Sequence, residues 1–200
     1  MIFAALMLIG AGGLLFYNNL EENRVEEETI STVTELEKIV EEYVAFNEKN
    51  EEKPIVKEVK LDTNSSIGTK SSLNLNGNTY IGIIYVPSFN NLAVPVIDTC
   101  TEQNLKISAC RYAGNIENNN MVIAGHNYKS LFGKLNKLAK GSIIYFKDLE
   151  NNAYKYKCTE ILTLGENDVE KMQTGNWDLT LFTCTYNNQE RLTLRFELAM

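Results

Sequence analysis

Three residues in the second half of the chain carry groups that could together catalyse acyl transfer. Cys184 lies in the apolar stretch LTLFTCT (179–185), and its thiolate would be a nucleophile if a nearby cation favoured ionisation. Arg191 could supply that cation, because a guanidinium keeps its charge at neutral pH and can stabilise an oxyanion. His126 ends the stretch MVIAGH (121–126) and is the only histidine in the sequence, hence the only imidazole that could carry protons. A thiol, an imidazole and a guanidinium suffice for acyl transfer through a thioester.

The spacing of Cys184 and Arg191 predicts that they face each other across a β-hairpin. From 191 to 198 polar and apolar residues alternate, which places Arg191 and Arg195 on the face away from the core. If Asn187 and Asn188 form a two-residue turn, Cys184 lies directly opposite Arg191. A four-residue loop would make the two diagonal neighbours on one face, and an odd loop or a bulge would separate them. Arg195 shares that face and is therefore a rival for the role of Arg191.

Each of these residues also has an ordinary explanation, and composition limits other chemistry. A cysteine in an apolar strand is most often a small core residue, and an arginine after a turn is most often solvated. One histidine excludes a histidine-rich metal site, and the four cysteines form no C-x-x-C pair, which argues against zinc and thioredoxin-type sites. We expect no metal and no cofactor, and no disulfide although Cys100 and Cys110 are close in sequence.

The charge of the chain is concentrated in one segment. The net charge is -7, but residues 21–53 hold 12 acidic and 4 basic residues, whereas the chain from 54 onward holds 14 acidic and 15 basic ones. The acidity therefore says little about a substrate. There is no basic patch with interleaved aromatic residues, so we exclude nucleic-acid binding.

The first twenty residues predict a membrane anchor. Residues 1–20 contain no charged side chain and are apolar through Tyr17, and twenty helical residues span about 30 Å, the thickness of a bilayer core. A cleaved signal peptide is the alternative, but no basic residue precedes the apolar stretch and no A-x-A site follows it. We favour an uncleaved transmembrane helix, with the remainder of the chain outside the cell because its acidic flank is easier to export.

An acidic helix and a linker follow. In residues 21–53 apolar side chains recur every three or four positions between glutamates, which predicts a helix. It could be a solvated stalk, a helix laid against the main domain, or a self-associating coiled coil, although fewer than four clean heptads disfavour the last. Residues 54–77 are rich in Lys, Asn, Ser and Thr and predict a linker.

The chain from 78 to 200 has a β pattern. Segments rich in β-branched and aromatic residues, separated by Asn, Gly and Ser clusters, predict strands at 80–86, 92–97, 121–124, 143–146, 153–164, 179–185 and 191–198. One short helix is expected, with Ser130 as N-cap, Leu131, Leu135 and Leu138 along one face, and Gly141 after its end. Seven or eight short strands with one helix favour a closed β-barrel over a sandwich.

The motifs around the three reactive residues resemble those of the sortase family. Residues 180–184 read TLFTC and match the sortase TLxTC strand, and Ala124-Gly125-His126 is similar to the sortase GH segment, about sixty residues upstream. Arg191, at the start of RLTLRF, resembles the arginine on the final sortase strand. The resemblance runs from about Thr79 to the C-terminus. It implies the eight-stranded sortase β-barrel with short helices, behind an N-terminal transmembrane helix and an acidic stalk.

The resemblance also implies roles. Cys184 would attack the scissile carbonyl of a surface protein's sorting signal, with Leu-Pro-any-Thr-Gly as the family default. His126 would protonate the leaving amine and deprotonate the incoming one, Arg191 would hold the substrate and stabilise the oxyanion, and Thr183 would help shape the pocket. The acceptor would be a cell-wall precursor or a pilin lysine amine, and the catalytic domain would lie on the outer face of a Gram-positive membrane.

The sequence leaves open which sortase subclass the chain resembles and which acceptor the thioester would meet. The stretch between Leu164 and Leu179 is too short for the helical insert of some class B-like sortases, so we expect a compact class A- or D-like enzyme. A cysteine peptidase that uses water as acceptor would share the same thioester. A non-catalytic surface binding module on a sortase-like barrel is the other alternative, and the presence of Cys, His and Arg speaks against it.

Overall fold

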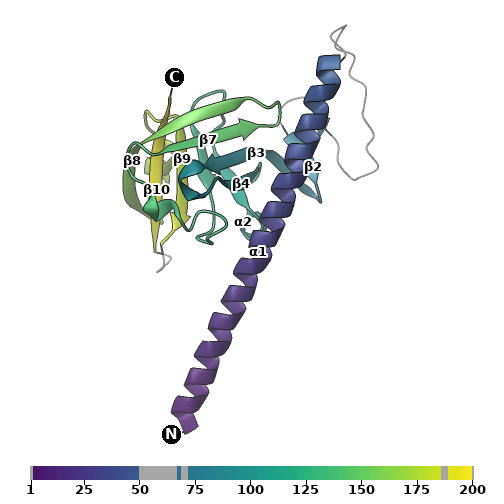
Figure 1. Cartoon of the computed structure of the whole chain (residues 1–200). Helices are drawn as coiled ribbons and strands as arrows, with labels where there is room; N and C mark the ends of the chain where they lie inside the picture. Colours follow the sequence, from purple (N-terminus) through teal and green to yellow (C-terminus); the bar gives the residue numbers. More distant parts are fainter. Residues whose placement is uncertain (1, 50–66, 69–71, 186–188, 200) are drawn as a thin grey trace.

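A long helix runs beside a β-barrel in the computed structural model, which describes residues 2–49, 67–68, 72–185 and 189–199 (Figure 1). The helix is α1 (Ile2–Lys49). The strands are β1 (Ile67–Gly68), β2 (Ser72–Leu75), β3 (Asn78–Val86), β4 (Leu92–Ile97), β5 (Ala109–Ala113), β6 (Met121–Ala124), β7 (Ile143–Asp148), β8 (Ala153–Gly165), β9 (Leu179–Cys184) and β10 (Glu190–Leu198). Short helices lie between them: η1 (Pro87–Phe89), α2 (Glu102–Leu105), η2 (Leu135–Lys137) and α3 (Val169–Gln173).

Eight of the described strands close the barrel that the sequence predicts. Their order is β3-β4-β5-β6-β9-β10-β8-β7, and β7 pairs back onto β3. The pairs β4–β5 and β6–β9 are parallel, and the others around the barrel are antiparallel. Closure leaves these strands without open edges, which removes sites for aggregation.

The interior of the barrel is filled by the apolar half of each alternating strand. On β10 Leu194 and Phe196 are fully buried, and on β9 Leu179 and Leu181 are too. All four belong to one core cluster, as the alternation predicts. Burial of each such side chain stabilises the fold by about 1.5–3 kcal/mol. The polar half of β10 consequently points outward, where Arg191 lies.

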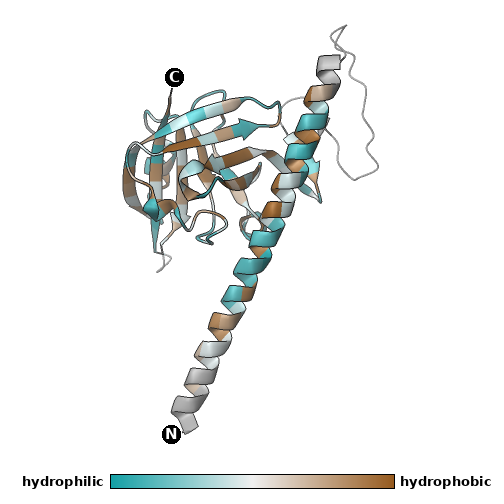
Figure 2. Ribbon diagram, viewed as in Figure 1, coloured by the Kyte–Doolittle hydropathy of each residue, from teal (hydrophilic) through white to brown (hydrophobic). Residues whose placement is uncertain are grey.

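The helix α1 packs against the barrel, so the helix-against-domain interpretation is confirmed. Val25 is fully buried in the main core cluster, and Val33 and Leu36 lie in a second cluster with residues of β2, β3 and β4. The hydroxyl of Tyr85 on β3 donates a hydrogen bond of 2.6 Å to the carboxylate of Glu37. Apolar residues of α1, seen as brown bands among polar residues in Figure 2, therefore pack against the barrel at Val25, Val33 and Leu36.

The membrane anchor predicted for residues 1–20 is not confirmed. Within the described residues, no helix has a stretch that is long and apolar enough to cross a bilayer. The helix α1 also continues without a break through the boundary predicted between residues 20 and 21.

Part of the predicted linker is a β-hairpin. Residues 72–75 form β2, which pairs with β3 and buries Leu73 and Leu75. The turn is Asn76-Gly77, where both residues have positive φ (52° and 83°), as a two-residue hairpin turn requires. An Asn-Gly pair after alternating leucines is a hairpin signal, so this strand could have been predicted. Residues 50–66 and 69–71 of the predicted linker lie outside the described residues.

The helix predicted from Ser130 is absent from this described segment. Only η2 (Leu135–Lys137) is helical there, although Leu131, Leu135 and Leu138 are buried as expected. The backbone N–H of Phe132 donates to the carbonyl of His126 at 3.0 Å, which is not the spacing of an α-helix. This hydrogen bond closes a loop from His126 to Phe132 in place of a helical turn.

Candidate active site

The parallel pairing of β6 and β9 brings His126 and Cys184 to the same end of the barrel. Ala124 on β6 pairs with Phe182 on β9, and the N–H of Gly125 donates to the carbonyl of Phe182 at 3.1 Å. His126 and Cys184 each follow this pair by two residues. Because both strands run in the same direction, both side chains leave the sheet at the same edge.

Gly125 is required by the packing just before His126. A Cβ at this position would lie 2.5 Å from the ring of Phe132, which is closer than real Cβ contacts. The absence of a side chain lets the buried Phe132 pack directly under the end of β6. The glycine of the GH segment therefore has a structural reason in this chain.

Cys184 lies opposite Arg191, as the hairpin register predicts. The pairs run from Arg191↔Cys184 to Phe196↔Leu179 without a shift. The N–H of Thr185 donates to the carbonyl of Glu190 at 2.9 Å, which continues the ladder one step further. The predicted turn at Asn187 and Asn188 lies outside the described residues. The condition on which the role of Arg191 depended, a register with Cys184 opposite it, is thus met.

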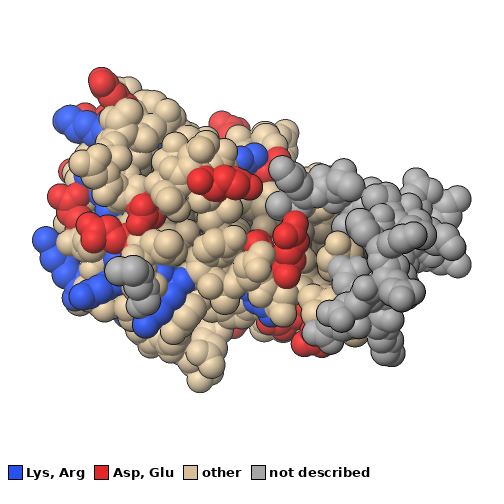
Figure 3. Space-filling view, turned by 90° about the horizontal axis from the view of Figure 1, so that it is seen from above, with Lys and Arg blue, Asp and Glu red and all other residues tan. Residues whose placement is uncertain are grey.

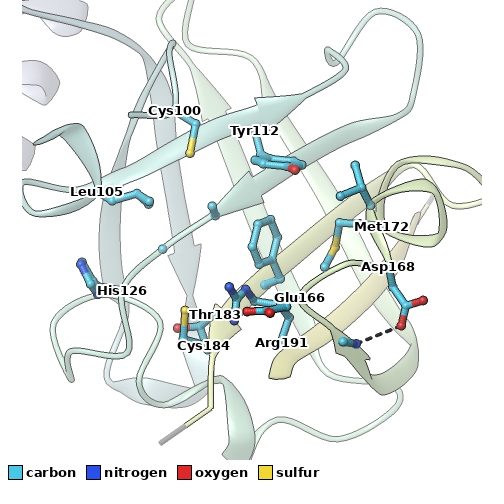
Figure 4. A pocket seen from close by; sticks show the side chains of 15 residues that line it. Cys100, Leu105, Tyr112, His126, Glu166, Asp168, Met172, Thr183, Cys184 and Arg191 are labelled. Atoms are coloured by element: carbon cyan, nitrogen blue, oxygen red, sulfur yellow. Dashed lines mark hydrogen bonds between the residues drawn. The ribbon is translucent and has the colours of Figure 1, made fainter. Parts of the chain in front are cut away.

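The three residues line one pocket of about 240 Å³ on the outer side of the barrel wall (Figure 4). In that view the sulfur of Cys184 lies between the ring of His126 and the guanidinium of Arg191. Ala124 and Phe182 line the pocket between β6 and β9, and the ring of Tyr112 meets that of Phe182 edge-on at 5.3 Å. The pocket lining as a whole is mostly apolar, whereas His126 and Arg191 place polar groups beside the thiol.

His126 is half-buried and tends to be neutral. Burial and the nearby cation of Lys106 both lower its pKa from the ordinary value of 6.5. The ring stacks on that of Tyr128, with centroids 5.0 Å apart and planes at 29°. A neutral imidazole at physiological pH can accept a proton, and its protonated form can donate one.

Thr183 lines the pocket beside Cys184. It is only 4% exposed and pairs with Leu192 of β10. Neighbouring strand residues point to opposite faces, so the side chain of Thr183 lies on the other side of β9 from Cys184. This position suits a residue that shapes the site from behind.

Arg195 is occupied elsewhere and does not line this pocket. Its guanidinium donates to Glu160 at 2.7 Å and to the carbonyl of Lys171 at 2.7 Å, and it lies 3.3 Å from the ring centre of Trp177. It is only 7% exposed. Arg195 thus fastens α3 and the following loop to β10, and Arg191 is the arginine that reaches the pocket with Cys184.

Several pocket residues were not predicted from the sequence. Cys100 and Leu105 come from the connection between β4 and β5, and Glu166, Asp168 and Met172 come from the connection between β8 and β9. All four cysteines of the chain are free thiols. Loop residues have no period that indicates which way they face, so only the three-dimensional arrangement reveals them.

One face of the molecule carries charges of both signs. On the face shown in Figure 3, acidic and basic side chains are mixed over the described part of the chain. Mixed charge of this kind gives no strong attraction for a polyanion.

Comparisons with known proteins agree with this geometry. Residues 84–199 match the family model described as Sortase domain. The chain is 32% identical over 155 residues to Sortase A of Listeria monocytogenes, covering 72% of this chain and 68% of that protein. Sortase C1 of Streptococcus agalactiae matches in structure with a TM-score of 0.53 and 26% identity, over 64% of this chain and 70% of that one. The Sortase D5 transpeptidase of Clostridium perfringens has a TM-score of 0.53 and 20% identity, over 60% of this chain and 78% of that one.

Proposed function

The chain belongs to the sortase family, and from this premise we propose that it is a transpeptidase in which Cys184 is the nucleophile, His126 the proton carrier and Arg191 the oxyanion-binding residue. The observation that carries the assignment of residues is the β9–β10 register. It sets Cys184 opposite Arg191, inside a pocket that His126 also lines.

The reaction follows from the groups present. His126 takes the proton of the Cys184 thiol. The thiolate then attacks the carbonyl carbon of the scissile peptide bond, and Arg191 stabilises the oxyanion that forms. The C–N bond then breaks as His126 protonates the departing amine, which leaves a thioester on Cys184. An incoming amine attacks the thioester, His126 takes its proton, and the new amide departs as the thiolate is restored.

The substrates of this reaction are proposed by family analogy. The donor would be a surface protein with a sorting signal of the Leu-Pro-any-Thr-Gly type, and the acceptor a cell-wall precursor or pilin amine. The mostly apolar pocket between β6 and β9 suits an extended apolar peptide segment. The relatives and solved structures carry class A, C and D names, so a compact class A- or D-like enzyme stays a prediction.

A peptide assay tests the proposed reaction. A peptide library with a quenched fluorophore is incubated with the full chain, with and without an amine acceptor, and the products are sequenced by mass spectrometry. We expect release of the C-terminal fragment and an amide product that incorporates the amine. If the C-terminal fragment is released at the same rate with and without the amine, and no amide product forms, the protein is a cysteine peptidase instead.

Two variants separate an enzyme from a binding module. Cys184→Ala should abolish turnover. Cys158→Ala removes a buried thiol that does not line the pocket, so this variant should retain turnover. If Cys184→Ala captured the same peptides and the parent chain never cleaved them, the barrel would be a binding module.

We also propose that the catalytic domain works on the outer face of the cell membrane. The support is the absence of charged residues from Met1 to Leu20 and the acidic composition that follows. Intact cells would be treated with a protease, and the barrel would be digested if it faces outward. Protection of the barrel in intact cells and digestion after lysis would refute this location.

A further inference from the structure

The helix α1 contacts the loop that follows His126. The carboxylate of Glu22 accepts a hydrogen bond from the backbone N–H of Lys129 at 3.0 Å and another from its ammonium group at 3.2 Å. The side chain of Glu22 is only 22% exposed. One turn further along, Val25 is fully buried in the same core cluster as Leu131 and Phe132.

The same loop holds the ring of His126. Tyr128 stacks on that ring, and the N–H of Phe132 closes the loop by donating to the carbonyl of His126 at 3.0 Å. Tyr128 precedes Lys129, the residue that Glu22 of α1 contacts, and burial and the carboxylate of Glu21 raise the pKa of the Tyr128 phenol. The residue that Glu22 of α1 holds thus directly follows the residue whose ring stacks on His126.

Among the described residues, the loop and Tyr128 are the contacts that hold the ring of His126. Within the described part of the chain, its ring makes no hydrogen bond to a carboxylate or carbonyl that would fix its orientation. Enzymes that use histidine as a proton carrier usually orient it with such a group. Here the stacked Tyr128 and the loop that carries it are the contacts available to do so.

We propose that α1 is a positioning element of the active site: Glu22 fixes the loop at Lys129, and through Tyr128 this contact sets the orientation of His126. Glu22 and Tyr128 are positioning residues, since neither lines the pocket. The effect on turnover depends on the transpeptidase function proposed above, whereas the effect on His126 itself does not.

Variants of Glu22 in the full chain test this inference. Glu22→Ala removes the acceptor for Lys129, and Glu22→Gln keeps an oxygen that can accept from the same N–H. Glu26→Ala is the matched control, because Glu26 is an exposed carboxylate one turn further along α1. We measure kcat and KM for the peptide, the pKa of His126 by NMR, and deuterium exchange at the amide of Lys129.

The expected effects of Glu22→Ala on kcat, KM and the pKa of His126 differ from those of losing a charge alone. Glu22→Ala should lower kcat about tenfold with KM changed by less than about twofold, because a small misplacement of a proton carrier slows chemistry without affecting binding. The pKa of His126 should rise, since a loosened loop leaves the ring more hydrated. Loss of the Glu22 charge alone would move that pKa down. The charged and titratable groups around the ring, namely Lys106, Tyr128, Cys184 and Arg191, are unchanged in this variant. Glu21, which acts on the phenol of Tyr128, is unchanged too.

The remaining outcomes decide the matter. Glu22→Gln should recover most of kcat, and exchange at the Lys129 amide should speed up at least about tenfold in Glu22→Ala but not in Glu26→Ala. If Glu22→Ala does not fold, Tyr128→Leu is the second variant. It keeps the bulk of the side chain but not the flat ring, and it should show the lower kcat and the higher His126 pKa. Equal kcat, His126 pKa and amide exchange in Glu22→Ala and Glu26→Ala would overturn the inference. If the parent chain cleaves no sorting peptide, the proposed function fails, while the NMR and exchange measurements still decide whether Glu22 positions His126.

Discussion

The two arginines on the outer face of β10 should separate into one that serves catalysis and one that serves stability. Arg191 lines the pocket with Cys184, whereas Arg195 is 7% exposed and joins Glu160, Lys171 and Trp177. The perturbations are Arg191→Ala and Arg195→Met. Methionine keeps most of the buried aliphatic stem of Arg195 and removes its charge.

The cost of Arg195→Met can be worked from its contacts. The cation–π contact with Trp177, at 3.3 Å and shielded from solvent, contributes about 1–2 kcal/mol. The charged hydrogen bond to the carbonyl of Lys171 contributes about 1.5 kcal/mol. The ion pair with Glu160 adds less than about 1 kcal/mol, because that carboxylate is 47% exposed and can be hydrated when left alone. The total is about 3 kcal/mol, which lowers Tm by about 6–12 °C in a chain of this size.

Arg191→Ala should show the opposite pattern. Loss of one oxyanion donor lowers kcat/KM about 100-fold to 1,000-fold. Its stability should change by less than about 0.5 kcal/mol, because the side chain is only partly buried at the rim of a pocket.

The assay is a pair of measurements on each variant: thermal unfolding followed by circular dichroism, and peptide cleavage well below the lower Tm. The reasoning is refuted if Arg195→Met keeps its Tm and loses activity about 100-fold. It is equally refuted if Arg191→Ala keeps full activity. The first result would make Arg195 the substrate-binding residue. The second would mean that the position of Arg191 opposite Cys184 does not contribute to catalysis.

Four further predictions concern the groups around the pocket. Lys106→Met should raise the pKa of His126, followed by NMR titration, because it removes a nearby cation that disfavours the imidazolium; an unchanged or lower pKa would contradict this. Since the pKa of His126 is lowered by folding, stability should fall as pH decreases through 6.5 toward the folded-state value, and His126→Gln should abolish that slope in denaturant titrations. Iodoacetamide should label Cys184 first among the cysteines in peptide mass maps, and the preference should vanish in denaturant. Gly125→Ala should destabilise the fold by about 1–3 kcal/mol in urea unfolding, because its Cβ would meet the ring of Phe132; unchanged stability would mean that the ring moves freely.

The sequence predicted what regular periodicity controls. Alternation along residues 191–198 gives the inner and outer faces of β10, and the hairpin with β9 then places Cys184 opposite Arg191. The helical period in residues 21–53 likewise identifies the buried face of α1 at Val25, Val33 and Leu36. A repeating pattern reports which face is covered, although not what covers it.

The sequence did not predict features that long-range contacts decide. β5 (Ala109–Ala113) was missed because it has five residues with Arg111 in the middle. The guanidinium of Arg111 reaches Asp98 and the carbonyl of Gly114, so its charge is satisfied by partners brought together in the fold. The helix expected from Ser130 failed for a related reason, since the bond from Phe132 to His126 replaces helical hydrogen bonding. Local propensity cannot anticipate either contact.

The parallel pairing of β6 and β9 also constrains when this site can exist during folding. Parallel neighbours cannot be joined by a tight turn. Residues 125–178, which include β7 and β8, therefore form the long connection that must be closed before β9 can pair with β6. Contacts this distant in sequence form slowly, because the entropy of closing the loop must be overcome first. A partly folded chain therefore carries the thiol of Cys184 without the imidazole of His126 beside it. The thiol and the imidazole come together only when the barrel closes, so the catalysis proposed for this pair should appear in a single late step of refolding.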